Sequence, residues 1–173
     1  LMVPLAHTMK RVFSQMPSAT EAEIFHLAKL PEVKVCFTGW MRRDEPEQYT
    51  QLIDSWINSD SLSERRAGVL AVNEGKRSEY TDIVKQLLER EQDHCIVGIS
   101  IQTLPRIDPE HAVELVAPFL KHRHEGVRLS VVEALTPDSE LAVKTLIMAM
   151  GDPDNRVRSQ AIKRLTNISH ELV

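Results

Sequence analysis

The residues whose types and spacing most suggest a chemical function, such as metal binding, are histidines that lie close together in the sequence. His122 and His124 flank Arg123, and imidazole is the most common metal ligand in proteins. Residues two apart on a helix point in different directions, and no acidic or thiol ligand stands at the spacing of a closed metal site. His94 precedes Cys95, but the chain has no second pair of this kind. The sequence therefore predicts no metal site and no cofactor. It places His122 and His124 in a solvated turn between helices.

Motifs that mark the common catalytic sites are missing from the sequence. It has no Gly-x-Ser-x-Gly nucleophile elbow, no glycine-rich phosphate loop, no His-Glu-x-x-His helix and no dinucleotide-binding fingerprint. Ser139 and Ser159 have no evident base partner. These observations predict a protein that is not an enzyme.

The composition is typical of an ordinary domain built from helices. Of the 173 residues, 42% are hydrophobic and 27% are charged, whereas aromatic residues make up only 5%. Glycine occurs only 6 times, which favours helices over a β-barrel with its many turns. The net charge of −4 gives no overall attraction to nucleic acid or to an anionic membrane, so neither is the expected partner.

Cysteine usage and hydropathy predict a cytoplasmic setting. Cys36 and Cys95 both lie in apolar stretches, which indicates reduced thiols buried in the core. No stretch approaches the roughly 20 apolar residues of a transmembrane helix. The first residue is Leu1 and not methionine, so we expect a chain that is processed, tagged or cut from a longer protein.

A pattern of paired helices recurs about every 30 residues. In the second helix of each pair, residues at i, i+4 and i+8 form one stripe, and this stripe is the expected core face. The stripe is clearest in three consecutive pairs, approximate in a fourth and inferred from periodicity in a fifth. Its three clear copies are Ile96, Ser100 and Leu104; Val127, Val131 and Leu135; and Val157, Ala161 and Leu165. The expected helix pairs are 21–30 with 33–41, 49–57 with 64–72, 83–88 with 96–104, 112–120 with 127–135, and 141–150 with 157–168.

Prolines and acidic residues predict where these helices begin, bend and end. Asp108 and Asp152 each precede a proline, so each is an expected N-cap with proline at the first helical position. Pro105 should end the helix that contains it. Pro118 lies inside a helical pattern and should kink it.

The clearest copy of the repeat resembles a known family. From Asp152 to Leu165 the sequence reads Asp-Pro-Asp, then Val-Arg, a small residue and a leucine. This order resembles the short HEAT-like repeats of bacterial α-solenoids. The resemblance is clear over residues 79–168, approximate over 49–78 and weak over 1–48.

The resemblance implies both an architecture and a set of structural residues. It implies an all-α, right-handed α-α superhelix of about five helical hairpins, forming a single domain over residues 1–173. First helices would lie on the convex side and second helices would line the concave side. In this family the turn aspartate and the helix arginine pair between successive repeats, which implies a ladder of Asp152, Arg128 and Arg158. Val97 replaces the arginine in one repeat, so the ladder is expected to be interrupted.

The densest basic cluster lies near the C-terminus. Arg156 and Lys163 are seven apart and share a helix face, and with Arg65 and Arg128 they could line the concave side. Such a strip would dock an acidic protein partner. The default interpretation is that these cations lie on the solvated surface of an end repeat, and the docking strip is the competing hypothesis. Arg128 is claimed by both the strip and the ladder.

A second resemblance supplies a different function. Residues 55–66 resemble part of the HEAT-like DNA glycosylases that excise alkylated purines, which hold damaged DNA in a basic groove lined with aromatic residues. Only Trp40 and Trp56 are available, and neither has a convincing catalytic aspartate as its partner. Asp44 follows Trp40 by four residues, but it lies in a turn-like context beside Pro46. The favoured hypothesis is therefore a protein–protein interaction or scaffold module. The alternative is a HEAT-like alkylpurine DNA glycosylase or a DNA-binding relative. Trp56 is expected to be a core residue.

Overall fold

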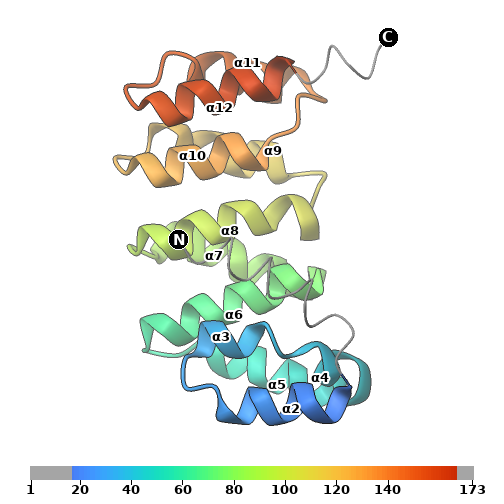
Figure 1. Cartoon of the computed structure of the whole chain (residues 1–173). Helices are drawn as coiled ribbons and strands as arrows, with labels where there is room; N and C mark the ends of the chain where they lie inside the picture. Colours follow the sequence, from blue (N-terminus) through green and yellow to red (C-terminus); the bar gives the residue numbers. More distant parts are fainter. Residues whose placement is uncertain (1–16, 167–173) are drawn as a thin grey trace. The chain divides into compact units, whose positions relative to one another are not determined.

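All regular secondary structure that the computed structural model describes, over residues 17–166, is helical (Figure 1). The prediction of an all-α fold is confirmed at this level. The end of the last predicted helix at residue 168 and the first 16 residues of the weak repeat lie outside the described part. The chain divides into two compact units, residues 1–75 and 76–173, and each is considered by itself.

The described residues of unit 1, 17–75, form one long helical hairpin and three shorter helices before it. Helices α5 and α6 pack on each other and correspond to the predicted pair 49–57 and 64–72. Helix α3 packs against α6, and a hydrogen bond of 2.6 Å from Ser63 Oγ to Glu32 Oε2 joins the two helices. The helices are α2 (Ser18–Leu27), α3 (Pro31–Val35), α4 (Gly39–Asp44), α5 (Pro46–Ile57) and α6 (Leu62–Gly75).

The predicted second helix at 33–41 is wrong, because the chain breaks it into α3 and α4. The buried Thr38 lies between them, and its hydroxyl donates to the carbonyl of Val35 at 2.9 Å. Gly39 then starts α4 by donating its N–H to Glu21 Oε1 of α2 at 2.9 Å. A Cβ at Gly39 would lie 2.5 Å from that same oxygen, so the contact depends on glycine.

The core of unit 1 lies where α5 crosses α6. Tyr49, Ile53 and Trp56 follow a helical period along α5, and all are buried, which confirms Trp56 as a core residue. The hydroxyl of Tyr49 donates to a backbone carbonyl of α6 at 2.9 Å, so its polar end is satisfied in the core. Gly68 of α6 lies against Ile57, where a Cβ would approach the backbone nitrogen to 2.6 Å.

Unit 2 is a succession of three helical hairpins. The second helices of these hairpins are α8, α10 and α12, and they lie side by side, with α10 packed on both of the others (Figure 1). Each also packs on the helical segment that precedes it in the chain. The elements are η1 (Ser78–Tyr80), α7 (Thr81–Arg90), α8 (His94–Ile107), α9 (Ala112–Val116), η2 (Ala117–Lys121), α10 (Glu125–Ala134), α11 (Glu140–Ala149) and α12 (Asn155–Thr166), where η denotes a 3₁₀ helix.

The predicted core stripe occurs in unit 2. Its members on α8 and α10, the C-cap Leu135 after α10, and the first two members on α12 are buried. Leu165 near the end of α12 is half-buried. Gly98 of α8 lies against Ser130 of α10, and a Cβ there would approach the serine Oγ to 2.9 Å. Helices α8 and α10 therefore approach each other closely through small residues.

Three prolines and their neighbours behave in different ways. As predicted, Pro118 interrupts its helix, since α9 ends at Val116 and the chain continues as the 3₁₀ helix η2. The prediction for Pro105 is wrong, because α8 continues to the buried Ile107. The prediction for Asp108 is also wrong, because this residue ends α8 and accepts bonds from Lys85 at 2.9 Å and His111 at 2.8 Å.

No helix in the described part of the chain combines the length and the apolar character needed to span a membrane.

Candidate functional site

Four turns that lead into long helices share one hydrogen-bond pattern. In each turn a side chain accepts the backbone N–H of the residue two positions further on, at 3.0, 3.1, 3.0 and 2.8 Å in chain order. Such a bond closes a small ring that mimics a backbone turn. The accepting residues are Ser59, Glu91, His122 and Asp152, and the residues that donate to them are Ser61, Asp93, His124 and Asp154.

The donating residue of the turn also stands where the next helix begins, and in three turns its side chain is the N-cap. Asp93 Oδ1 accepts from two N–H groups of α8 at 3.1 and 3.0 Å. His124 Nδ1 accepts from Gly126 of α10 at 3.1 Å, and Asp154 Oδ1 accepts from Arg156 of α12 at 2.9 Å. The predicted N-cap at Asp152 is therefore wrong by two residues, because Asp152 accepts inside the turn.

In three of the four turns, an arginine near the start of the following helix donates hydrogen bonds back to two carbonyls of the turn. One guanidinium nitrogen of Arg65 donates to the carbonyls of residues 59 and 60, at 3.0 and 2.8 Å. Arg128 and Arg158 make the equivalent two bonds to the carbonyls of their own turns, at 2.9 and 3.2 Å and at 2.8 and 2.8 Å. The remaining turn has Val97 at this position.

These bonds set the register of the approximate repeat. The pattern begins at residues 59, 91, 122 and 152, so Arg65 is equivalent to Val97, Arg128 and Arg158. Glu64 then falls at the first position of the core stripe, and Gly68 falls at the second. Both residues lie at stripe positions that the sequence alone left uncertain by one residue.

His122 and His124 are the counterparts of Asp152 and Asp154. A ring nitrogen can accept an N–H only when it carries no proton, so both imidazoles present an unprotonated Nδ1 to the backbone. Burial is the largest influence on His122 and lowers its pKa below the ordinary value. The sequence reading missed this role, although aligning His-x-His with Asp-x-Asp in the repeat would have revealed it.

Arg128 and Asp152 join one hairpin of unit 2 to the next. Two parallel bonds link them, from Nε to Oδ2 at 2.7 Å and from Nη2 to Oδ1 at 2.9 Å. The side chains are only 12% and 4% exposed. The hydrogen bond from Arg128 lowers the pKa of Asp152, and the same bond raises the pKa of Arg128. Arg158 donates to its own turn, as described above.

The remaining cations of the predicted strip differ in exposure. The Arg156 side chain is 60% exposed and lies 3.3 Å from both Asp154 and Glu125. Lys163 is exposed on the same helix, and no described residue forms an ion pair with it. Arg65 belongs to unit 1 and is half-buried against its own turn. Of the four predicted residues, Arg156 and Lys163 therefore share one exposed helix face.

The tryptophans considered for a glycosylase site lie in the core. Trp40 of α4 is 8% exposed, and its ring meets that of Phe25 edge-on at a centroid distance of 6.3 Å. Asp44 is exposed at the end of the same helix. Trp56 is 5% exposed. Neither indole presents a face on which an extruded base could stack.

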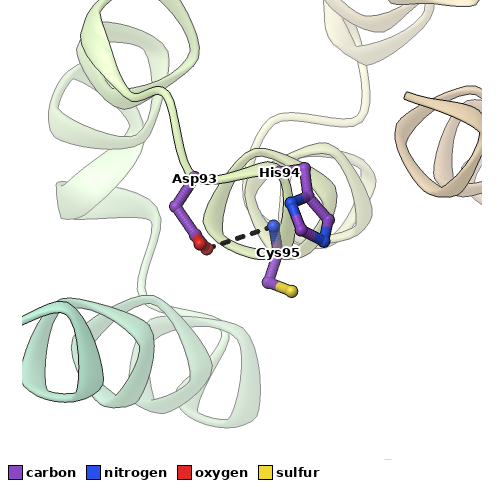
Figure 2. Close-up of side chains that lie close together, drawn as sticks. All are labelled: Asp93, His94 and Cys95. Carbon is purple, nitrogen blue, oxygen red and sulfur yellow. Dashed lines mark hydrogen bonds between the residues drawn. The ribbon is translucent and has the colours of Figure 1, made fainter. Parts of the chain in front are cut away.

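The cysteines depart from the predicted burial. Cys36 is half-buried, whereas Cys95 is exposed at the start of α8, so the expectation of a core thiol is wrong at Cys95. Figure 2 shows that its side chain shares this helix start with Asp93 and His94. One ligand atom from each of the three residues lies within 4.8 Å of the other two.

No family model matches the sequence, and no curated protein matches it. Support for a repeat therefore comes from the four turns, in which different side chains make equivalent hydrogen bonds at regular positions.

Proposed function

We propose that the chain is a HEAT-like α-solenoid segment that acts as a protein–protein interaction module in the cytoplasm, with an acidic protein segment as its partner. The observation that carries this proposal is the exposed face of α12, where Arg156 and Lys163 lie seven residues apart. Two cations on one face, with Ser159 between them and the exposed Ile162 beside them, can pair with carboxylates and also cover apolar surface.

The proposed binding strip is narrower than the one that the sequence predicts. Arg65 and Arg128 each hold the carbonyls of their own turn, and Arg128 also binds Asp152. Releasing Arg128 would leave the buried Asp152 without its donor, and releasing Arg65 would break both of the bonds that hold its turn, one of them to the part-buried carbonyl of residue 59. We therefore assign these two arginines to holding the turns in shape, and Arg156 and Lys163 to contact with the partner.

Among the candidate activities, protein binding agrees best with the placement of the aromatic residues. A DNA glycosylase needs aromatic faces that stack on an extruded base, whereas Trp40 and Trp56 are buried. The overall charge of −4 also gives no long-range attraction to a phosphate backbone. The interaction hypothesis requires only the exposed helix face.

The proposal is tested by cross-linking from one defined position. A photo-reactive amino acid is placed at residue 159 of α12, between the two cations, and a matched probe is placed at Lys144 of the partner helix α11. Lys144 is exposed and pairs with Glu140 at 2.6 Å, so it reports on a different face of the same hairpin. A partner captured from position 159 but not from 144 is then purified and its affinity measured.

The double reversal Arg156→Glu and Lys163→Glu should weaken the affinity of that partner at least about tenfold, and added salt should do the same in the unchanged chain. The control Lys144→Glu should leave the affinity within about twofold. The proposal would be contradicted if the double variant and the control Lys144→Glu bound the partner with equal affinity. It would also be contradicted if the partner were captured only from position 144.

A further inference from the structure

The start of α8 gathers three different metal-ligating groups in consecutive residues. Asp93 supplies a carboxylate, His94 an imidazole and Cys95 a thiol, and their ligand atoms lie within 4.8 Å of one another (Figure 2). In the four-coordinate zinc sites of proteins, bond lengths of about 2.0–2.3 Å place ligand atoms roughly 3.3–3.8 Å apart. His94 and Cys95 are exposed, so small rotations of their side chains would bring the three groups to that spacing.

Packing does not explain why a cysteine occupies position 95. Free cysteine is among the most buried residue types, yet Cys95 is exposed. The equivalent positions of the other three turns are held by Ser63, Gly126 and Arg156, which share neither size nor polarity. The fold therefore tolerates many residues here, and the thiol is available for chemistry.

The imidazole of His94 is held in place by a second histidine. Its ring stacks on that of His124, with centroids 3.8 Å apart and planes inclined by 15°. His124 is fixed in turn, because its Nδ1 accepts the N–H of Gly126 at the start of α10. The stack therefore holds the His94 ring in one orientation, and imidazole is a common ligand of zinc.

Asp93 is the N-cap of α8. One carboxylate oxygen accepts from the N–H groups of Cys95 and Ile96. The two cap bonds also fix the orientation of the carboxylate. Such a supporting bond is a usual requirement for a metal ligand.

We propose that Asp93, His94 and Cys95 form a binding site for a zinc-class divalent cation, with His124 as the positioning residue that holds His94. Mixed thiolate, imidazole and carboxylate donors suit zinc or cobalt better than the oxygen-seeking magnesium or calcium. Three protein ligands leave one coordination position for water. Binding displaces the thiol proton to solvent, because the thiolate is the form that binds the metal.

Cobalt tests the site directly, because a thiolate bound to Co²⁺ gives an intense charge-transfer absorption. Titration of the reduced full chain with Co²⁺ should give this band with one metal per chain, and Zn²⁺ should abolish it. Cys95→Ser should remove the band, and His94→Gln should weaken Co²⁺ binding at least about tenfold. Asp93→Asn should also weaken it while the helix stays capped, because asparagine is an equally good N-cap.

Two control variants separate the site from general binding to thiols and histidines. Cys36→Ser removes the other cysteine, and His111→Gln removes an exposed histidine that pairs with Asp108. Both should keep the band, and far-ultraviolet circular dichroism should show that every variant is folded. Absence of the band with a chemically titratable Cys95, its persistence in Cys95→Ser, or its loss in Cys36→Ser would overturn the proposal. His124→Asn removes the ring but keeps an acceptor for the Gly126 N–H, so loss of Co²⁺ binding in this variant would identify the stack as the positioning contact, and unchanged binding would exclude that role for His124.

Discussion

Arg128 of α10 and Asp152 of the turn before α12 form two parallel hydrogen bonds of 2.7 and 2.9 Å between successive hairpins of unit 2. Arg128 also holds two carbonyls of its own turn. One side chain therefore fixes a turn and joins it to the next.

Removing one member of this pair should destabilise the chain substantially. Asp152→Ala leaves the guanidinium of Arg128 without its carboxylate in a place where the side chain is only 12% exposed. We expect the free energy of unfolding to fall by about 2–4 kcal/mol, measured by urea denaturation. Asp138→Ala, at an exposed carboxylate that bonds only Thr136 among the described residues, should change it by less than about 0.5 kcal/mol. Similar losses in both variants would show that the pair has no special role.

Two substitutions should create an arginine–aspartate pair, equivalent to Arg128 and Asp152, at positions 97 and 122. Val97 stands where the other repeats have arginine, and His122 stands where the next turn would supply the acid. Val97→Arg alone places a charge at a buried position and should destabilise the chain. Adding His122→Asp should recover about 1–2 kcal/mol beyond the sum of the single effects, measured as a double-mutant cycle. Strict additivity would show that the two positions do not face each other.

His122 should make stability depend on pH in a defined direction. Its pKa is lowered in the folded chain, so the unfolded chain binds more protons as the pH falls through 6.5. Stability should therefore decrease from about pH 7 downward. His122→Asn, whose amide oxygen can still accept the turn N–H, should reduce this decrease.

His111 is the internal control for that measurement. The hydrogen bond that His111 donates to Asp108 raises the pKa of His111, so the contribution of this pair to stability is present at low pH and lost as the pH rises. His111→Gln should change the pH profile with the opposite sign to His122→Asn. Profiles that shift in the same direction would contradict the assigned burial of His122.

Gly68 should be intolerant of a methyl group. A Cβ would lie 2.6 Å from the backbone nitrogen of Ile57, so Gly68→Ala must push α5 and α6 apart. A cost of about 1–3 kcal/mol is expected in thermal or urea unfolding. At Gly151 the nearest atom to a Cβ is 3.5 Å away, and Gly151→Ala should be close to neutral. Equal effects would mean that the helices do not cross at Gly68.

Helical periodicity explains why most of the helix pairs could be predicted. Val127 and Val131 lie one turn apart on the same face, and this spacing indicates both the helix and its buried side. The break between α3 and α4 could not be predicted in this way. It depends on Glu21, which is distant in sequence and bonds the first N–H of α4.

The chemistry of the turns was harder to predict than the helices. Ser59, Glu91, His122 and Asp152 make the same bond with four different functional groups, so a comparison by residue type does not align them. Cys95 looked like a core residue because the residues after it are apolar. Its position at the start of α8 instead leaves the thiol exposed, since the stripe begins one residue later.

The most direct measurement of the proposed interaction is a backbone amide NMR titration with the cross-linked partner. The account predicts that the largest shift changes follow α12 through residues 156, 159 and 163, and that they disappear with Arg156→Glu and Lys163→Glu. Changes concentrated on α11 around Lys144, or changes on α12 that survive the reversals, would contradict it.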